Sequence, residues 1–359
     1  MKKHGPKKNI CFIITKSEIG GAQRWVSDVV NSLDNEYSVT IVTNAPGWLG
    51  SQVKNSNVNF FYINKLVKRN SLSSLFHIRK ILKKNSIDIL VLSSANAGFY
   101  GRISALFLNI KTIYVSHGWS SLYRGGHLKF LFSLIEKILS WLPNVVLCVS
   151  DSDKTKAINL IGINETKVDV LKTKIFDKNR NNLSYKLKNK NKKIDVLTIT
   201  RLDYPKRVDL LINAVKNTDY NLHIIGDGIL KNDLMNLSFG CENIYFLGEF
   251  EEFSQYNEFD IFSLISDSEG LPLSPIEAMS HGLPLLLSDV GGCSELIHKN
   301  GILVENNELS IFEGLEIIKN NLELFSRQSS ILYKENFSLN NDISHYQKYF
   351  DKKIKNNVY

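Results

Sequence analysis

The sequence has few cysteines and no long apolar run, and both scarcities narrow the classes of protein it can encode. Only four of its 359 residues are cysteine, far apart and without a C-x-x-C pair. This spacing argues against a disulfide framework and a zinc centre, and it favours a reducing cytoplasm. Apolar runs end at charged residues well before the roughly 18–20 residues that a spanning helix needs. The basic start is followed by too short an apolar stretch for a signal peptide. We therefore expect a cytoplasmic protein.

The composition is typical of a globular chain with more than one domain. Hydrophobic residues make up 43% of the sequence and charged residues 22%. A single hydrophobic core stops growing at about 250–300 residues, and this chain is longer. We therefore expect two globular domains.

The net charge of +8 conceals an asymmetry between the two halves of the chain. Residues 1–193 carry 31 Lys and Arg against 11 Asp and Glu, a net charge of +20, whereas residues 194–359 carry 13 against 25, a net charge of −12. A basic half can face nucleic acid or an anionic membrane surface, or it can be solvated without any partner. No recognised DNA- or RNA-binding module is present, so we expect no nucleic-acid partner.

Short β-branched and apolar runs alternate with helical patterns, which is typical of parallel βα units. The strands expected in the first half span residues 10–15, 38–43, 59–63, 87–93, 112–116 and 145–150. Those expected in the second half span residues 195–199, 221–225, 244–247, 261–264 and 285–287. This alternation predicts an α/β fold of two Rossmann-like domains.

A segment dominated by Lys and Asn indicates where the first domain ends. It spans residues 173–193 and has the composition of an exposed connection. We expect a first domain over residues 1–172, this linker, and a second domain over residues 194–337. Apolar and aromatic side chains at helical spacing predict a C-terminal helix within residues 338–359.

Two glycines follow the first expected strand. Gly20 and Gly21 stand where a strand tip meets a helix start. Glycine there lets a ligand approach the backbone, and the free N–H groups of a helix N terminus favour an anion. The full G-x-G-x-x-G fingerprint is absent. The pair therefore predicts either a tight turn or a contact with a phosphate or an acceptor.

Two cations follow the first strand of the second half. Arg201 leaves the strand's carboxyl end, the edge at which open α/β sheets bind ligands, and Lys206 lies one loop further on. Arginine as a planar fork and lysine as a point charge both suit a diphosphate. The alternative is a solvated loop with no ligand.

The segment after the strand at 261–264 contains two candidate glutamates. Glu269 stands at the strand tip beside a glycine, well placed to accept hydrogen bonds from sugar hydroxyls. Glu277 has a structural alternative, because Ser274 as N-cap, Pro275 as first helical residue and Glu277 as third fit a capping box. The same helix start offers backbone N–H groups to a phosphate.

His117 follows the strand at 112–116 and so stands at the carboxyl edge of the first domain's sheet. A lone histidine is often structural, but this edge is where such sheets bind ligands. Both a structural and a functional role stay open for it.

Asp151 and Asp153 match the D-x-D pattern by which some sugar-nucleotide enzymes hold a divalent cation. Here the pair opens an expected helix, where Asp is favoured by the helix dipole and as a cap. We expect capping and no metal ion.

Glu269 and Glu277 together form an E-x7-E signature, and the chain resembles the retaining glycosyltransferases of family 4. Further motifs carry the resemblance along nearly the whole chain: Gly20-Gly21-Ala22, Ser116-His117-Gly118, Arg201 with Lys206, Gly226-Asp227-Gly228, His281-Gly282-Leu283-Pro284, and Gly291-Gly292 with Glu295. The resemblance implies a GT-B fold, with two Rossmann-like domains facing across a cleft and a C-terminal helix crossing back to the first domain.

The resemblance also implies roles in binding a nucleotide-diphosphate sugar against the second domain. Arg201 and Lys206 would hold the diphosphate, Glu277 the ribose hydroxyls and Glu269 the hydroxyls of the sugar. Backbone N–H groups of the segment after Glu269 would contact sugar or phosphate; its residues are Gly270, Leu271, Pro272, Leu273 and Ser274.

The first domain would bind the acceptor. His117 would contact the transferring sugar, and Gly20 and Gly21 would border the donor phosphate and the acceptor. The residues expected to take part in catalysis are His117, Glu269, Arg201 and Lys206.

The implied activity is transfer of a hexose or N-acetylhexosamine, with retention, from a UDP-type donor to a glycan or lipid-linked acceptor in bacterial surface polysaccharide synthesis. No metal or other cofactor is expected, because fixed cations would stabilise the leaving diphosphate. The alternatives are a nucleotide-sugar epimerase of the same fold and a non-catalytic sugar-binding protein.

Cations and apolar residues of the basic half form a mix suited to an anionic lipid surface. The cations are Lys65, Lys68, Arg69, Arg79, Lys80, Lys83, Lys84, Arg124 and Lys129, and the apolar residues are Leu72, Leu75, Phe76, Leu128, Phe130 and Leu131. We expect a peripheral enzyme at the inner leaflet of the plasma membrane. The alternative is that these apolar residues pack in the domain core.

Overall fold

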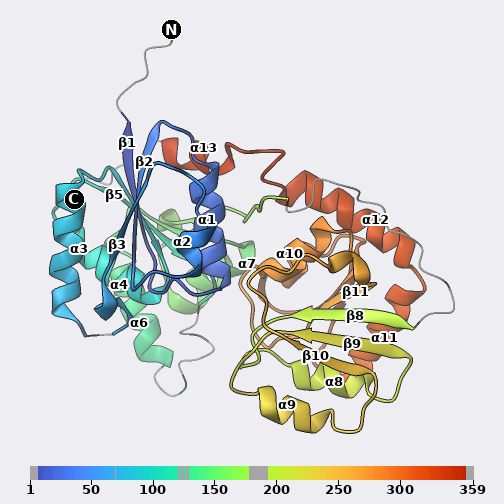
Figure 1. The fold of residues 1–359 in the computed structure, drawn as a ribbon. Helices are drawn as coiled ribbons and strands as arrows, with labels where there is room; N and C mark the ends of the chain where they lie inside the picture. Colours follow the sequence, from blue (N-terminus) through green and yellow to red (C-terminus); the bar gives the residue numbers. More distant parts are fainter. Residues whose placement is uncertain are drawn as a thin grey trace. The chain divides into compact units, whose positions relative to one another are not determined.

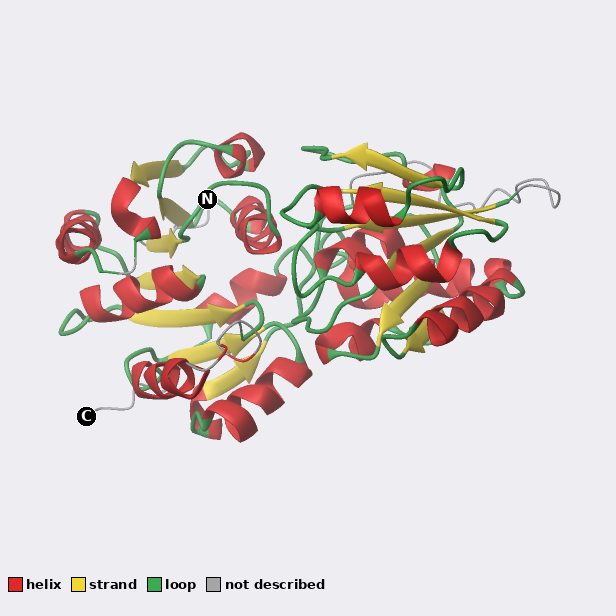
Figure 2. Cartoon of the chain, turned by 90° about the horizontal axis from the view of Figure 1, so that it is seen from below, coloured by secondary structure: helices red, strands yellow, loops and turns green. Residues whose placement is uncertain are grey.

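A computed structural model of the chain describes residues 7–68, 70–119, 122, 126, 129–177 and 193–352. The chain divides into two compact units (Figure 1). The N-terminal unit comprises Met1–Thr173 and Asp342–Tyr359, and the C-terminal unit comprises Lys174–Asn341. Each unit is a parallel sheet with helices on both faces (Figures 1 and 2), which confirms the expected α/β fold of two Rossmann-like domains.

The N-terminal unit contains a seven-stranded parallel sheet of order β3-β2-β1-β4-β5-β6-β7. Its strands are β1 (Lys8–Ile13), β2 (Tyr37–Thr43), β3 (Val58–Tyr62), β4 (Ile89–Ser93), β5 (Lys111–Ser116), β6 (Val145–Cys148) and β7 (Val168–Val170). Every residue of β4 and β6 is buried, as expected for central strands that helices cover on both faces.

The helices of the N-terminal unit include α1 (Gly21–Ser32), α2 (Trp48–Gln52), α3 (Leu72–Lys84), α4 (Ala95–Ser104), α6 (Lys129–Leu139) and α7 (Asp151–Lys156). Helix α3 illustrates why they form where they do. The Ser71 side chain accepts from the backbone N–H of Ser74 at its start, and Lys83 and Lys84 lie in its last turn, where the helix dipole favours cations.

The C-terminal unit contains a six-stranded parallel sheet of order β10-β9-β8-β11-β12-β13. Its strands are β8 (Ile194–Ile199), β9 (Tyr220–Ile225), β10 (Ile244–Gly248), β11 (Ile261–Leu264), β12 (Leu285–Ser288) and β13 (Gly301–Val304). Its helices are α8 (Val208–Val215), α9 (Lys231–Leu237), α10 (Leu273–Ser280), α11 (Glu308–Lys319) and α12 (Leu322–Leu332). The strand order reverses between β8 and β11, and ligands of such sheets bind beyond the carboxyl ends of the strands at this point.

The C-terminal helix packs on the N-terminal unit, as the fold class implies. Helix α13 (His345–Asp351) buries Tyr346, whose ring meets that of Trp25 edge-on at 5.7 Å. The hydroxyl of Tyr37 donates to Asp351 at 2.5 Å, and the Lys111 ammonium donates to the carbonyl of Phe350 at 2.6 Å. These contacts join residues more than 200 positions apart in the sequence.

The observed elements differ from the expected ranges at several points. The C-terminal helix is shorter than residues 338–359: it begins at His345, and Ser338 instead bridges Ile175 within the C-terminal unit. Residues 174–177 of the expected linker belong to that same unit, and residues 178–192 lie outside the described ranges. Strands β7 and β13 were not expected. Within the described ranges, no helix has both the length and the apolar content needed to span a bilayer.

Candidate functional site

Two sequence-predicted residues of the C-terminal unit meet at the carboxyl edge of its sheet. The ammonium of Lys206, in the loop after β8, lies 2.5 Å from a carboxylate oxygen of Glu269, in the segment after β11. The two side chains are only 14% and 9% exposed. Because little water screens the pair, both charges act strongly on the polar groups of a ligand bound beside them.

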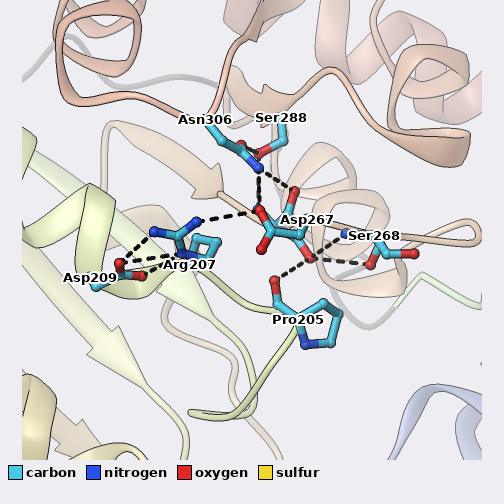
Figure 3. Close-up of polar contacts among 8 residues, drawn as sticks. Pro205, Arg207, Asp209, Asp267, Ser268, Ser288 and Asn306 are labelled. Atoms are coloured by element: carbon cyan, nitrogen blue, oxygen red, sulfur yellow. Dashed lines mark hydrogen bonds and ion pairs between the residues drawn. The ribbon is translucent and has the colours of Figure 1, made fainter. Parts of the chain in front are cut away.

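A polar network fixes the two segments that carry this pair (Figure 3). Asn306, just after β13, donates to the Ser266 carbonyl at 3.0 Å and to Asp267 at 2.8 Å, and it accepts from Ser288 at 2.5 Å. The carbonyl of Pro205 accepts from the backbone N–H of Asp267 at 2.9 Å. Hydrogen bonds therefore join the segments after β8, β11 and β13 with one another and with the last residue of β12.

Arg207 adds a charged contact to the same network. Its guanidinium pairs with Asp209 at 2.8 Å and with Asp267 at 3.5 Å (Figure 3). The hydrogen bond that Arg207 donates to Asp209 is the main cause that raises the pKa of Arg207, so the guanidinium stays charged at physiological pH. Arg207 thus pairs with Asp209 and Asp267, whereas Lys206 pairs with Glu269.

Arg201 does not join the Lys206–Glu269 pair. Its side chain is 59% exposed and pairs with Asp203 at 3.2 Å. The loop that carries it packs on the turn after β9, where the backbone of Leu202 donates to the Asp227 carbonyl at 2.9 Å. A Cβ on Gly226 would lie 1.8 Å from the carbonyl oxygen of Thr200, so this close approach requires glycine.

Glu277 lies on α10 and not in a capping box. The helix begins at Leu273 with Pro272 as N-cap, so the expected N-cap role of Ser274 is wrong, and no side chain caps this end. The Glu277 carboxylate instead accepts from the hydroxyl of Tyr256 at 3.1 Å. The capping box is therefore ruled out for Glu277, and Tyr256 from another segment orients its carboxylate.

Tyr256 itself is held by stacking. Its ring, 2% exposed, stacks on His281 with centroids 4.4 Å apart, and His281 lies at the C-terminal end of α10. Nδ1 of His281 is 2.9 Å from the carbonyl of Glu277. The His281-Gly282 motif therefore helps to orient Glu277 through Tyr256.

The segment between the two glutamates leads into α10 and forms its first turn from Leu273 onward. Leu271 is buried, and the Gly270 carbonyl accepts from the backbone N–H of Gly292 at 2.8 Å. The Gly291-Gly292 motif thus braces the segment, and the N–H groups at the start of α10 lie between the glutamates in sequence.

In the N-terminal unit, His117 lies directly after β5. Its Nε2 is 2.7 Å from the hydroxyl of Ser93, the last residue of β4, and its ring meets the Trp25 ring edge-on at 5.3 Å. Burial lowers the pKa of His117 to about 4, so the imidazole is neutral near pH 7. A neutral imidazole can exchange a hydrogen bond with a ligand but does not act there as a stored proton donor.

This burial predicts an acid-dependent loss of stability. The pKa of His117 falls from 6.5 to about 4 on folding. The buried neutral ring therefore contributes to the free energy of unfolding above pH 6.5, and this contribution is lost as the pH falls from 6.5 to 4. The expected decrease in the free energy of unfolding is about 3 kcal/mol. All four tryptophans lie in the N-terminal unit, so tryptophan fluorescence in urea measures its unfolding. The stability difference between wild type and His117→Gln should shrink by that amount between pH 7 and pH 4; a constant difference would contradict the burial of a neutral ring.

The two glycines at the start of α1 are placed as the sequence predicts. Gly20 is the N-cap of the helix, with an extended backbone and no side-chain cap, and Gly21 is its first residue. Trp25, one turn further along α1, contacts His117. Helix α1 therefore connects the glycine turn with the histidine.

The D-x-D residues form the first turn of α7. The Ser150 side chain caps this helix by accepting from the backbone N–H of Asp153. Asp151 pairs with Lys172 at 3.2 Å. In the part of the chain that the structure describes, no three His, Cys, Asp or Glu side chains gather in a way that could hold a metal ion.

The residues expected at a lipid surface have mixed positions. Leu75 packs against the core of the N-terminal unit, whereas Leu72, Phe76, Phe130 and Leu131 are exposed. The side chains of Lys65, Lys68, Lys80, Lys83, Lys84 and Lys129 are exposed, whereas Arg79 is half-buried and donates to the carbonyls of Ser104 and Leu106. Arg69, Arg124 and Leu128 lie outside the described residues.

Comparisons with known proteins identify the family. Residues 19–173 match the family model described as Glycosyltransferase Family 4, and residues 193–318 match that of Glycosyl transferases group 1. The chain is 46% identical to the O-antigen biosynthesis glycosyltransferase WbnH of Escherichia coli, over 95% of this chain and 98% of the relative. The chain belongs to glycosyltransferase family 4. This glycosyltransferase is thus an enzyme of sugar transfer, not an epimerase or a non-catalytic binding protein.

Other similarities are more distant. The glycosyltransferase is 25% identical to UDP-Gal:alpha-D-GlcNAc-diphosphoundecaprenol alpha-1,3-galactosyltransferase of Escherichia coli, over 87% of this chain and 88% of the relative. Among solved structures, its fold is similar to that of HepE of Anabaena in complex with UDP-glucose, with a TM-score of 0.76, 16% identity, and coverage of 95% and 99% of the two chains. The GT-B fold of this glycosyltransferase is thereby shown.

Three residues of the site of this glycosyltransferase were not expected from the sequence. Tyr256 and Asn306 orient Glu277 and Asp267, and Ser93 contacts His117. Ser93 and Asn306 each end or follow a strand that carries no recognised motif. Their position after a strand of a parallel sheet was the signal that could have pointed to them.

Proposed function

We propose that this glycosyltransferase transfers a hexose or N-acetylhexosamine from a UDP-sugar to a lipid-linked glycan acceptor, with retention of the anomeric configuration, in the synthesis of a bacterial surface polysaccharide such as O-antigen. The observation that carries the proposal is the shielded Lys206–Glu269 pair at the carboxyl edge of the C-terminal sheet. The relatives support the chemistry: one is named for O-antigen biosynthesis, and another for a UDP-galactose donor and a diphosphoundecaprenol-linked acceptor.

Each candidate residue has a role in this reaction. Lys206 and the exposed Arg201 hold the donor diphosphate, and the N–H groups at the start of α10 assist them. Glu269 accepts hydrogen bonds from the sugar hydroxyls. Glu277, oriented by Tyr256, accepts those of the ribose.

Charge development explains why these cations matter. Breaking the anomeric bond leaves negative charge on the diphosphate and positive charge on the sugar ring. Fixed cations stabilise the former as it forms, and the neighbouring carboxylate of Glu269 stabilises the latter. The acceptor hydroxyl attacks the anomeric carbon on the face from which the diphosphate leaves, and the leaving phosphate takes the hydroxyl proton. The product therefore retains the anomeric configuration of the donor.

The N-terminal unit takes the acceptor. Neutral His117, fixed by Ser93, contacts the transferring sugar, and the turn at Gly20 and Gly21 borders the phosphate and acceptor. We further propose that no metal ion takes part, since Lys206 and Arg201 already supply positive charge for the diphosphate. An acceptor linked to a lipid would place the enzyme at the inner face of the plasma membrane, as a peripheral protein on an anionic surface.

The test is a panel of labelled nucleotide sugars offered with lipid-extracted acceptors in the presence of EDTA. We expect a UDP-sugar to be consumed only when acceptor is present, and NMR of the product to show the anomeric configuration of the donor. Consumption of the donor without an acceptor, an inverted product or abolition by EDTA would each contradict part of the proposal.

A further inference from the structure

Helix α6 turns its apolar side toward solvent. Phe130 is 80% exposed and Ile138 58%, and Leu134 lies between them at helical spacing. The exposed apolar residues of α6 and of the turn just after it are here called the α6 stripe. They are Phe130, Leu131, Leu134, Ile135, Ile138 and Trp141. A surface helix of a globular protein ordinarily packs its apolar face against the core, whereas α6 (Figure 1) exposes its apolar face to solvent.

The inward side of α6 carries polar groups beside the buried Leu139, and these polar groups fix the orientation of the helix. Ser133 on α6 and Ser140 just after the helix are buried, and Glu136 pairs with Arg102 of α4 at 3.0 Å. Arg102 is 2% exposed and lies 4.2 Å from the centroid of the Tyr114 ring. Turning α6 to bury the stripe would leave a buried guanidinium without its carboxylate. The ion pair therefore holds the apolar stripe outward.

The charge of the surroundings indicates what covers the stripe. The N-terminal unit carries 27 Lys and Arg against 12 Asp and Glu, a net charge of +15, and two of the lysines, Lys129 and Lys137, are exposed on α6 itself. Two copies of so basic a unit would repel each other. An anionic bilayer complements both features, because it attracts the cations and takes up the apolar side chains.

We infer that the α6 stripe inserts into an anionic phospholipid surface and is the element by which the enzyme docks on the membrane. Phe130, Leu134 and Ile138 enter the boundary between headgroups and acyl chains, while Lys129 and Lys137 extend to the headgroups. The inference deepens the proposed function by naming the surface that meets the membrane, but the docking itself requires no transfer reaction.

The test uses the full chain and vesicles of phosphatidylglycerol and phosphatidylethanolamine. Wild type should float with the vesicles, more strongly at low salt. The variant Phe130→Ser/Ile138→Ser should lose at least tenfold in vesicle affinity. The matched control Phe239→Ser/Ile317→Ser removes the same two residue types from exposed positions of the C-terminal unit and should bind within twofold of wild type.

Trp141 supplies a direct reading of insertion, since it is 64% exposed whereas Trp25 and Trp119 are buried. Wild-type fluorescence should shift to the blue on vesicle binding, and Trp141→Phe should abolish the shift while keeping the affinity. Equal vesicle binding by the stripe variant, or no shift at saturation, would overturn the inference. So would reversible self-association that the stripe variant abolishes, because a second copy would then cover the stripe.

Two readouts separate this inference from the proposed function. The stripe variant should bind UDP as wild type does, and its tryptophan fluorescence in urea should show that the N-terminal unit is still folded. Lys206→Ala should bind vesicles as wild type does. If wild type bound vesicles but no nucleotide, the proposed function would fail and the docking surface would stand.

Discussion

Replacing Lys206 by alanine is expected to lower kcat by a factor of about 10²–10³, equivalent to about 3 to 4 kcal/mol of transition-state stabilisation. The side chain of Lys206 is 14% exposed, so its charge acts on the leaving diphosphate with little screening by water. The measurement is steady-state transfer from the donor identified by the nucleotide-sugar panel, together with the affinity for UDP, which should also fall.

The matched control is Lys231→Ala. Lys231 belongs to the same unit and also pairs with a carboxylate, Asp227, at 2.9 Å, but that pair lies in solvent. This variant should keep kcat within about twofold, as the small contribution of surface ion pairs implies. Since Lys206→Ala leaves the carboxylate of Glu269 without its ammonium, thermal unfolding must be measured beside activity. A folded Lys206→Ala enzyme with wild-type kcat would show that Lys206 does not stabilise the leaving group.

The second large effect is expected for Glu269→Gln, which keeps the shape of the side chain and removes its charge. We expect kcat/KM for the donor sugar to fall about 10²-fold, because hydrogen bonds to a charged acceptor contribute about 1.5–3 kcal/mol and the charge opposite the sugar ring is lost as well. The exposed Glu308, in the first turn of α11, provides the control Glu308→Gln, which should be silent.

The affinity for UDP distinguishes the roles of the two paired residues. UDP contains the diphosphate and the ribose but not the sugar, so Glu269→Gln should bind UDP within about threefold of wild type. Lys206→Ala should not. An equal loss of UDP affinity in both variants would indicate that Glu269 acts only by positioning Lys206.

Much of the fold could be predicted from the sequence because the central strands of parallel sheets are continuous apolar runs. The run at 261–264 coincides with β11, and the other expected strands agree with the observed ones to within a few residues. Strand β7 escaped notice because it has only three residues, and β13 because it begins with glycine. Such short edge strands owe their pairing to a neighbour, which a local pattern does not contain.

The start of α10 shows how a local rule fails. Ser274 and Glu277 fit a capping box, yet the helix begins at Leu273. Pro275 has no N–H to leave unsatisfied, so the first turn includes it without cost and the helix extends back to the extended residue Pro272. Glu277 therefore takes no part in a capping box, and its carboxylate is oriented by the hydroxyl of Tyr256.

The candidate site was predicted as residue types at strand ends, but not as pairs. Lys206 and Glu269 are 63 positions apart, and they meet because β8 and β11 are neighbours in the sheet. Tyr256 could not be assigned from the sequence, because its partner Glu277 becomes evident only when the segments of the sheet edge are assembled. Hydrogen bonds between distant segments are consequences of topology rather than of any local pattern.

The most direct measurement for the central claim is a crystal structure of the enzyme with UDP or the intact donor bound. The account predicts the diphosphate within hydrogen-bonding distance of the Lys206 ammonium, the ribose at Glu277 and the sugar at Glu269. Nucleotide density at another place, away from the carboxyl ends of β8 and β11, would contradict it.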